Sequence, residues 1–232
     1  MAVFLPDAVP DSMLVYSDDA LIAVNKPTGL LAVPGRSESD CVALRVQARY
    51  PDALVVHRLD QATSGLMLLA RGKPMQSALS VLFRDRKVAK TYVAVVHGMV
   101  QGEVGEVALP LMADWPQRPR QKVDALGKAS LTHWRVLARD AATQTTRLAL
   151  QPLTGRTHQL RVHMQAMGHP IVGDALYGID DASYGPAARS NGNANDSGLQ
   201  SPAPRLLLHA QRLLLPHPQS GAPLDLLAPL PF

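Results

Sequence analysis

The stretch "VVHRLDQATSGLMLLAR", residues 55–71, places charged side chains where a predicted strand gives way to a turn. The runs VVHRLD and GLMLLAR favour extended chain, and the small polar residues between them are typical of a turn. Because side chains alternate across a strand, Arg58 and Asp60 would project together from one face at the end of the sheet. Such a carboxylate can act as a nucleophile or a general base if a cation keeps it charged. An isolated pair of this kind is more often structural.

Other strands and short helices alternate along the chain and predict the fold class. Strand signals recur in five further segments: 20–33, 89–98, 129–139, 145–153 and 205–230. Three segments have helical periodicity with apolar residues along one face: 39–50 (Cys41, Leu44, Ala48), 74–83 (Met75, Ala78, Leu79, Leu82) and 157–168 (Leu160, Met164, Met167). Many strands with short helices between them predict one α+β domain on a largely antiparallel mixed sheet.

Length and composition predict how this domain is delimited. With 232 residues, 47% of them hydrophobic, the chain can form one large domain or two small ones. We expect an N-terminal extension over 1–16 and a single domain over 17–232. The segment 180–205 is rich in Ser, Asn, Gly, Ala and Pro. It has too few large aliphatic side chains to offset its ordering entropy, so we predict a mobile loop there.

Several classes of protein are disfavoured by the same sequence. The start, MAVFLPDAVPDSM, lacks the basic residues of an export signal, and no apolar run approaches the ~18 residues of a membrane span. The single cysteine, Cys41, excludes internal disulfides and a multi-cysteine metal cage. The eight histidines form no metal-binding pattern. We therefore expect a soluble cytoplasmic protein that holds no metal, and we take a monomer as the default state because the sequence does not encode the oligomeric state.

Positive charge is concentrated in the middle of the chain. Residues 1–60 have a charge balance of −3 and residues 71–135 one of +6, within a net charge of +4. A localised basic region is typical of proteins that bind a phosphate backbone, although an ordinary solvated surface gives the same pattern. The candidate phosphate contacts in this region are Arg84, Arg86, Lys87, Lys90, Arg118, Arg120 and Lys122.

A second unusual stretch is "QPLTGRTHQLRVHMQAMGHPIVGDALYG", residues 151–178. It predicts the end of a strand, a turn, and a helix with Arg156 at its entry. His158, Arg161 and Gln165 would lie opposite the apolar face of that helix. Because a helix N-terminus can bind an anion, Arg156 could hold a phosphate or the Asp60 carboxylate. The alternative is a cationic helix face in water.

Together, these stretches resemble the signature blocks of the RluA-type pseudouridine synthases. HRLDQATSGLMLLAR and LTGRTHQLRVHMQAMGHPIVGDALYG carry the resemblance, with NKPTGLLAVPG before them, KTYVAVVHG between them and RLLLHA after them. The resemblance extends from about Ser17 to the C-terminus, apart from 180–205. The run LMADWPQRPRQKV is similar to the RluA subgroup of the family.

The resemblance implies a pseudouridine synthase fold and an isomerisation of uridine within RNA. The family detaches uracil from C1′ of its ribose, rotates it and reattaches it through C5, without a cofactor. By this resemblance Asp60 is the catalytic acid, Arg156 is the arginine that pairs with it, and Tyr92 packs on the target base. Arg58 would fill the space left by the everted base, and Arg161 is a further candidate for RNA binding.

The RluA subgroup implies two targets, uridine 746 of 23S ribosomal RNA and uridine 32 of tRNA anticodon loops. A different rRNA or tRNA target is one alternative, and a non-catalytic RNA-binding module is another. An idle module would be expected to lose its reactive acid, yet Asp60, Tyr92 and Arg156 are all present. A third alternative is a hydrolase in which His57 or His158 pairs with Asp60. It is disfavoured because the chain has no G-x-S-x-G motif.

Overall fold

The computed structural model describes residues 7–36, 38–178 and 205–232. Within these ranges ten strands form one sheet in the order β1-β2-β4-β11-β5-β10-β9-β6, with β3 paired to β4 and β12 paired to β11. The strands of this sheet are β1 (Leu14–Ser17), β2 (Leu21–Lys26), β3 (Ala53–Val55), β4 (Ser64–Arg71), β5 (Ala89–His97), β6 (Val104–Val107), β9 (Thr132–Asp140), β10 (Thr145–Pro152), β11 (Leu208–Pro216) and β12 (Pro223–Leu227).

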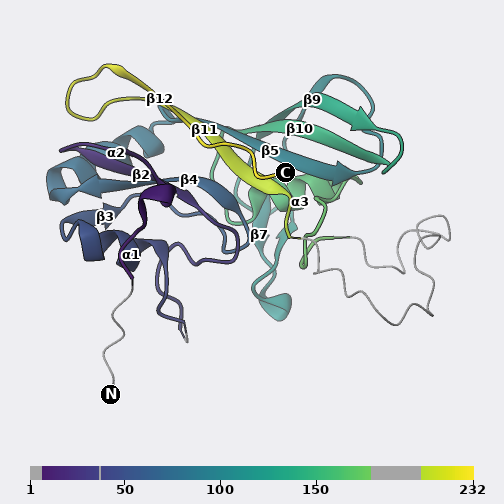
Figure 1. Cartoon of the computed structure of the whole chain (residues 1–232). Helices are drawn as coiled ribbons and strands as arrows, with labels where there is room; N and C mark the ends of the chain where they lie inside the picture. Colours follow the sequence, from purple (N-terminus) through teal and green to yellow (C-terminus); the bar gives the residue numbers. More distant parts are fainter. Residues whose placement is uncertain (1–6, 37, 179–204) are drawn as a thin grey trace, which may run out of the picture.

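A small hairpin and short helices complete the architecture. The hairpin strands β7 (Leu111–Ala113) and β8 (Gln121–Val123) form a separate two-stranded sheet in the described part of the chain. Figure 1 shows this hairpin projecting away from the sheet beside α3. The helices are α1 (Val42–Arg49), α2 (Gly72–Arg84), α3 (Gln159–Ala166) and the 3-10 turns η1 (Asp11–Met13) and η2 (Trp115–Gln117).

Alternating apolar side chains give the N-terminal half of the sheet a core on each face. On β2, Ile22 and Val24 pack on the same side as helix α1, whereas Leu21 and Ala23 pack on the side of helix α2. All four side chains are fully buried. Helix α2 contributes Leu79 to the second core, as its periodicity predicts. The two-sided burial explains why these strands are almost continuously apolar.

Helix α3 forms the core of the C-terminal half against strands β5 and β10. Leu160 and Met164 of the helix pack with Leu148 and Leu150 of β10. Strand β11 then joins the two halves, because it pairs with β4 on one side and β5 on the other (Figure 1). The β11–β4 pair is parallel, and the other pairs between named strands in the described ranges are antiparallel. The predicted α+β class with a largely antiparallel mixed sheet is confirmed.

The β4–β11 junction requires glycine at position 65. Gly65 pairs with Ala210, and its φ of +111° is a conformation that other residues rarely adopt. A Cβ atom there would lie 2.3 Å from the Ala210 carbonyl oxygen. Replacing Gly65 by alanine is therefore expected to lower the free energy of unfolding by at least about 3 kcal/mol.

Chemical denaturation of the variant would measure this loss. Gly221→Ala is the matched control, because Gly221 also has a positive φ, +73°, but no atom of the described residues lies within 4 Å of the position that a Cβ atom would occupy. Its expected cost is only about 1–2 kcal/mol of left-handed strain. Equal costs for the two substitutions would show that the close approach of β11 does not constrain this junction.

Several local predictions differ from the structure. Strand β3 ends at Val55, so the segment 56–60 lies outside regular secondary structure and its side chains do not alternate across a sheet. Of the predicted face of α1, Cys41 is buried as expected and is the N-cap, but Ala48 is exposed and the helix buries Val42, Ala43 and Val46. The buried face of the helix is set by the strands on which it packs, and the periodicity of the helix sequence does not reveal where those strands lie.

The N-terminal boundary also differs from the predicted one at residue 17. Val9 and Met13 belong to the core of the first half, and β1 begins at Leu14 within the main sheet. The domain therefore includes at least part of the predicted 1–16 extension. The predicted loop at 180–205 lies almost wholly outside the described residues. No helix in the described ranges is long and apolar enough to cross a membrane.

Candidate active site

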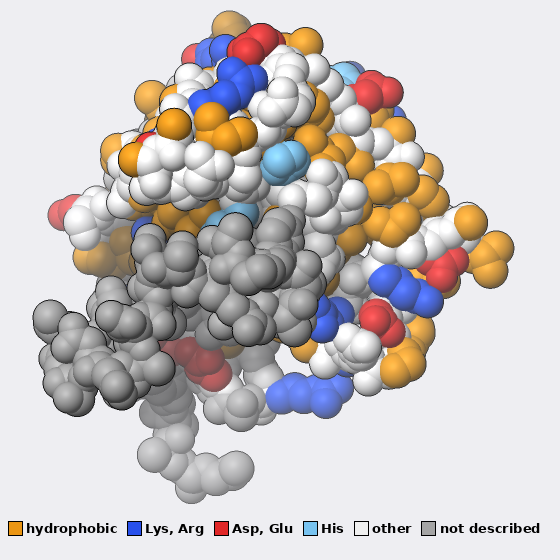
Figure 2. Space-filling model, turned by 90° about the vertical axis from the view of Figure 1, so that its right-hand side faces the viewer, with side chains coloured by type: hydrophobic (Ala, Val, Ile, Leu, Met, Phe, Trp, Pro, Cys, Tyr) orange, Lys and Arg blue, Asp and Glu red, His pale blue; other side chains and the backbone are white. Residues whose placement is uncertain are grey.

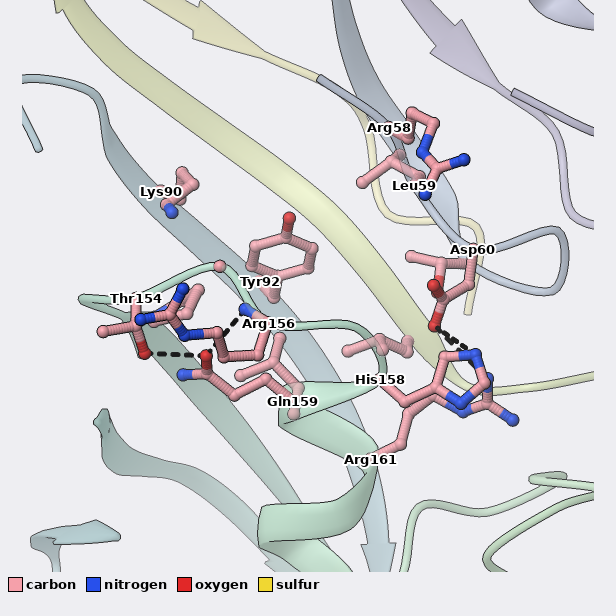
Figure 3. Close-up of a pocket in the computed structure, with 15 residues that line it drawn as sticks. Arg58, Leu59, Asp60, Lys90, Tyr92, Thr154, Arg156, His158, Gln159 and Arg161 are labelled. Atoms are coloured by element: carbon pink, nitrogen blue, oxygen red, sulfur yellow. Dashed lines mark hydrogen bonds and ion pairs between the residues drawn. The ribbon is translucent and has the colours of Figure 1, made fainter. Parts of the chain in front are cut away.

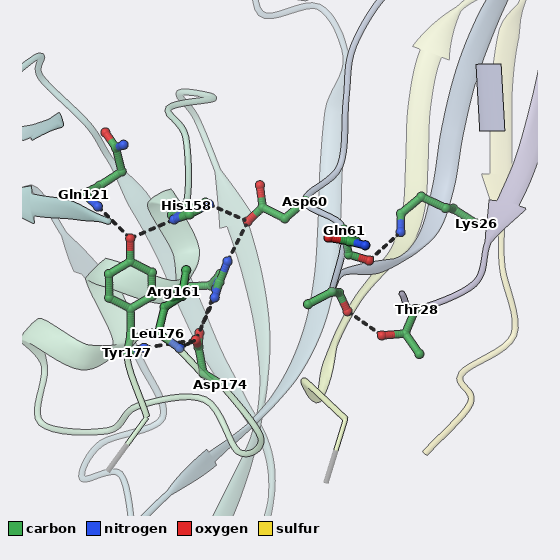
Figure 4. A network of polar contacts seen from close by, with 11 residues as sticks. Lys26, Thr28, Asp60, Gln61, Gln121, His158, Arg161, Asp174, Leu176 and Tyr177 are labelled. Atoms are coloured by element: carbon green, nitrogen blue, oxygen red, sulfur yellow. Dashed lines mark hydrogen bonds and ion pairs between the residues drawn. The ribbon is translucent and has the colours of Figure 1, made fainter. Parts of the chain in front are cut away.

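A distant segment fixes the turn that follows Asp60. The buried Lys26 ammonium donates a hydrogen bond of 2.9 Å to the carbonyl of Gln61, and the Thr28 hydroxyl donates one of 2.7 Å to the carbonyl of Ala62 (Figure 4). Burial lowers the pKa of Lys26 to about 8, with the negative charge of Asp60 opposing that shift. The block NKPTG thus positions Asp60 by holding the two residues after it.

Asp60 lies in a pocket at the junction of the two halves of the sheet (Figure 3). The lining comes from the loop before β4, from β5, from the end of β10, from the β10–α3 turn with the start of α3, and from the first residue of β11. It consists of Arg58, Leu59, Asp60, Thr63, Lys90, Tyr92, Pro152, Thr154, Gly155, Arg156, His158, Gln159, Leu160, Arg161 and Leu208. The two signature stretches, far apart in the sequence, therefore meet around one cavity.

The cation that binds the Asp60 carboxylate is Arg161. Its Nη1 lies 3.2 Å from Asp60 Oδ2, while its Nε and Nη2 each lie 2.7 Å from a carboxylate oxygen of Asp174 (Figure 4). The Arg161 side chain is 5% exposed and that of Asp174 is 0% exposed. The bidentate pair fixes the plane of the guanidinium and directs its remaining nitrogen toward Asp60.

Asp174 is the buried counter-charge that makes this arrangement possible. Burial alone would raise the pKa of Asp174, but the hydrogen bonds and charge of Arg161 outweigh it and lower that pKa. The backbone N–H groups of Leu176 and Tyr177 also donate to Asp174 Oδ1, at 2.9 and 3.0 Å. Asp60, Arg161 and Asp174 therefore form a continuous ionic network at one side of the pocket.

Arg156 lines the same pocket but does not contact Asp60, which corrects the predicted pairing. In Figure 3 it lies at the other end of the pocket, beyond Tyr92. Its backbone N–H donates to Gln159 Oε1 at 3.1 Å, and its Nε donates to the Ala129 carbonyl at 3.4 Å. Arg156 belongs to the turn before α3, which Gln159 ties down, so its exposed side chain is directed away from the acid.

Tyr92 occupies the middle of the pocket, between Lys90 and Asp60 (Figure 3). Its position on β5 is paired with Ala210 of β11 and Leu150 of β10, at the centre of the sheet. Burial raises the pKa of Tyr92, and the negative charge of Asp60 adds to that shift. The phenol is therefore protonated at neutral pH and presents both a ring and a hydroxyl group to the cavity.

Arg58 and His57 are adjacent in sequence but have different surroundings. Arg58 is exposed and lines the pocket beside Leu59 (Figure 3). His57 is not part of the lining. It stacks on Phe83 with 4.6 Å between ring centroids, and its Nε2 accepts a hydrogen bond from the Leu68 N–H. Burial lowers the pKa of His57 to about 3. The hydrolase alternative that pairs His57 with Asp60 has no geometric basis.

The other predicted phosphate contacts are distributed over the surface. Arg84, Arg86 and Lys87 are exposed around the end of α2, and Arg118 and Lys122 are exposed on the β7–β8 hairpin. Figure 2 shows one face of the molecule, where Lys and Arg side chains lie in separate small groups, several beside acidic side chains. Two of these residues have acidic partners, since Arg84 pairs with Asp85 and Lys122 with Asp124.

Two basic candidates are engaged inside the protein. Arg120 donates a hydrogen bond to the Leu176 carbonyl, and Arg161 is the buried network residue described above. Arg161 therefore does not fit its predicted assignment to phosphate contact. The prediction that Arg161 lies on a solvent-exposed face of the helix is wrong. Helix α3 begins only at Gln159, and Asp174 covers the side of the helix that was expected to face water. In the described ranges, no group of His, Cys, Asp and Glu could hold a metal ion.

The sequence was also compared with known proteins. Residues 20–166 match the family model described as RNA pseudouridylate synthase. The chain is 45% identical, over 235 residues, to the "Dual-specificity RNA pseudouridine synthase RluA" of Escherichia coli (strain K12), covering 100% of this chain and 99% of that protein. This chain belongs to the RNA pseudouridylate synthase family. A protein with the same name from Vibrio parahaemolyticus is 46% identical to this synthase over 226 residues, which is 95% of this chain and 84% of that protein.

Solved structures of human proteins have the same fold as this synthase. Human RNA Pseudouridylate Synthase Domain Containing 1 superposes with a TM-score of 0.73 at 28% identity, covering 94% of this chain and 83% of that one. Human RNA Pseudouridylate Synthase Domain Containing 4 gives 0.70 at 26% identity, covering 94% and 88%. The predicted resemblance and fold are confirmed. The synthase is an isomerase that converts uridine to pseudouridine in RNA, rather than a hydrolase or an idle binding module.

Sequence reasoning missed four residues that organise the site. Lys26 and Asp174 are buried charges within blocks that the family resemblance identified, but no role was assigned to them. Gln159 ties the β10–α3 turn to the start of β9 through hydrogen bonds of 3.0 Å to the carbonyl of Leu131, which precedes the strand, and to the hydroxyl of Thr132. The fourth residue that was missed is Tyr177. The signal for Lys26 and Asp174 is a charged residue inside an otherwise apolar or turn-forming block, because such a charge needs a partner.

Proposed function

We propose that this synthase modifies uridine in structured loops of both ribosomal and transfer RNA, namely uridine 746 of 23S rRNA and uridine 32 of tRNA anticodon loops. The chain matches proteins named as dual-specificity enzymes over its whole length. The observation that carries the mechanism is the Asp60 carboxylate, bound to Arg161 at one side of a pocket whose centre is Tyr92. The enzyme works as a cytoplasmic monomer without a cofactor.

In this proposal Asp60 is the group that reacts with the substrate. Cleavage of the bond between uracil and C1′ builds positive charge on the ribose, which a nearby carboxylate stabilises or captures. Arg161 holds that carboxylate in place, since its own position is fixed by Asp174. The freed uracil rotates within the pocket and is reattached through C5, where a proton must leave.

Tyr92 and Arg58 act on the base and on the RNA around it. A base in a folded RNA reaches the pocket only after it has been turned out of its stack. The Tyr92 ring provides a surface on which the uracil can stack, and its hydroxyl oxygen relays the proton lost from C5 by passing its own proton to water. Arg58 is exposed at the pocket edge, where a planar guanidinium can occupy the vacated space.

Cations at the pocket and beyond it contact the RNA backbone in this proposal. Lys90 and Arg156 line the pocket at the end away from Asp60 (Figure 3), and in this proposal they bind the phosphates that flank the target nucleotide. More distant contacts come from Arg84, Arg86, Lys87, Arg118 and Lys122. Arg120, whose guanidinium binds the Leu176 carbonyl, contributes through the position of the hairpin.

The choice of target is tested by mapping pseudouridine in RNA from a strain that lacks the gene for this chain. We expect the modification to disappear from uridine 746 of 23S rRNA and from uridine 32 of the affected tRNAs. Expression of the intact chain should restore both sites, whereas the Asp60→Asn variant should restore neither. An unchanged pattern at both positions would refute the proposed targets, and loss at only one would refute dual specificity.

A further inference from the structure

Tyr177 and His158 connect the β7–β8 hairpin to the side of the pocket where Asp60 lies. The Tyr177 residue is 1% exposed, and its hydroxyl accepts a hydrogen bond of 2.7 Å from the backbone N–H of Gln121, the first residue of β8. The same hydroxyl lies 2.7 Å from His158 Nδ1. On the other side of its ring, His158 Nε2 lies 3.8 Å from Asp60 Oδ2 (Figure 4).

The bonding around Tyr177 determines which nitrogen of His158 carries a proton. Because the Gln121 N–H can only donate, the Tyr177 oxygen must accept from it. Among the described residues, the acceptor within reach of the buried Tyr177 proton is His158 Nδ1. The neutral ring must then carry its proton on Nε2, the nitrogen that faces Asp60. Burial lowers the pKa of His158, with the charge of Asp60 opposing, so the neutral ring is the relevant form at pH 7.

The backbone of His158 has an uncommon conformation at the position from which its ring reaches both Tyr177 and Asp60. His158 has a left-handed φ of +53° and directly precedes helix α3, a conformation that is uncommon for residues other than glycine and Asn. Nε2 and Arg161 Nη1 approach the same carboxylate oxygen of Asp60. At 3.8 Å the His158 contact is longer than a direct hydrogen bond, and catalytic hydrogen bonds that are long in a free enzyme often tighten in its substrate complex.

We propose that His158 is a positioning residue for Asp60, and that Tyr177 fixes the tautomer in which His158 donates to the carboxylate. The pair also ties the β7–β8 hairpin, through Gln121, to the reacting group. This inference rests on the role proposed for Asp60. In it, Arg161 supplies the charge that binds the carboxylate, and the His158 Nε2–H restricts the rotation of the carboxylate about its own axis.

Two substitutions of His158 separate its two contacts. In His158→Asn the side-chain oxygen can take the place of Nδ1 and accept from Tyr177, but the shorter side chain places no donor of its own at Asp60. Asn also tolerates the left-handed backbone. In His158→Gln the longer side chain can place an N–H near Asp60. We expect His158→Asn to lower the single-turnover rate constant about ten- to a hundredfold, with an unchanged Kd for RNA and an unchanged melting temperature. His158→Gln should recover part of that loss.

Tyr177→Phe and nuclear magnetic resonance test the tautomer independently of activity. The ¹⁵N shifts of the His158 ring should show the Nε2–H tautomer in the wild-type chain. In Tyr177→Phe they should show a mixture, because the donor to Nδ1 is gone. His133→Asn is the matched control, since His133 lies outside the pocket and pairs with Glu106 at 3.5 Å. Its rate constant should equal that of the wild type.

Three results would overturn the proposal. They are wild-type rates for His158→Asn, equal losses in both His158 variants together with lowered melting temperatures, and an Nδ1–H tautomer in the wild-type ring. Asp60→Asn is assayed beside these variants. If it is inactive while His158→Asn is fully active, only the positioning role fails. If Asp60→Asn itself remains active, the proposed role of Asp60 fails.

Discussion

Replacing Asp60 by asparagine is expected to lower the single-turnover rate constant by at least about 10⁴-fold, a loss on the scale seen when a reacting group is removed from other enzymes. Asparagine has nearly the same shape, so Arg161 remains bound to Asp174 and the pocket remains intact. The variant lacks the negative charge that stabilises or captures the cationic ribose. RNA tritiated at C5 of uridine measures the reaction, because reattachment through C5 releases the label to water.

The Kd for RNA separates chemistry from binding in this experiment. Asp60 carries a negative charge, which contributes no attraction to the phosphate backbone, so the Asp60→Asn variant should bind RNA within about threefold of the wild type. Asp52→Asn is the control, since Asp52 pairs with Arg71 outside the pocket. It should leave both the rate constant and the Kd unchanged. Tritium release by Asp60→Asn within tenfold of wild type would remove Asp60 from its role.

The second large effect is expected at Arg161 rather than Arg156. Arg161→Gln removes the cation from Asp60 and should lower the rate constant by about 10²–10³-fold, as for the loss of a preorganised donor in other enzymes. Arg156→Gln leaves the bond between Arg161 and Asp60 intact, so its rate constant should fall less than tenfold. Its effect should fall mainly on the Kd for RNA, because Arg156 is exposed at the pocket.

Arg161→Gln should also destabilise the fold, because it leaves the Asp174 carboxylate buried without a partner. Breaking a buried pair in this way costs about 3–5 kcal/mol in the free energy of unfolding. The double variant Arg161→Gln/Asp174→Asn removes that unpaired charge and should recover most of the stability. Its rate constant should stay low, since Asp60 still lacks its cation. Recovery of the rate together with stability would show that Arg161 acts only through the fold.

Strand and helix positions were predictable where burial is two-sided or strongly periodic. The run at 65–71 became β4, whose first seven residues are buried, and the periodicity of 74–83 located α2 apart from its first two residues and its last. These signals are local, because in these two segments the apolar pattern matches the side chains that are removed from water. The charged segment before β4 was wrongly predicted to be a strand. The sequence does not reveal that the turn after Asp60 is fixed by a hydrogen bond from the distant Lys26.

Residues of the site could be predicted from the sequence, but the contacts between them could not. Asp60 and Tyr92 could be assigned through the family blocks, and they line one pocket. The partner of Asp60 was misassigned because periodicity places Arg161 on an outer helix face. Only the fold reveals that Asp174 covers that face. Long-range pairs of this kind depend on how separate segments pack, which no local spacing encodes.

The most direct test of the account is the pseudouridine content of RNA after incubation with the purified chain. A single-turnover reaction on an RNA stem-loop that contains one target uridine should yield one pseudouridine for each tritium released, when the product is digested to nucleosides and separated. The Asp60→Asn chain, saturated with the same RNA, should yield none. Pseudouridine formed at the wild-type rate by Asp60→Asn would contradict the central claim that this carboxylate carries out the reaction.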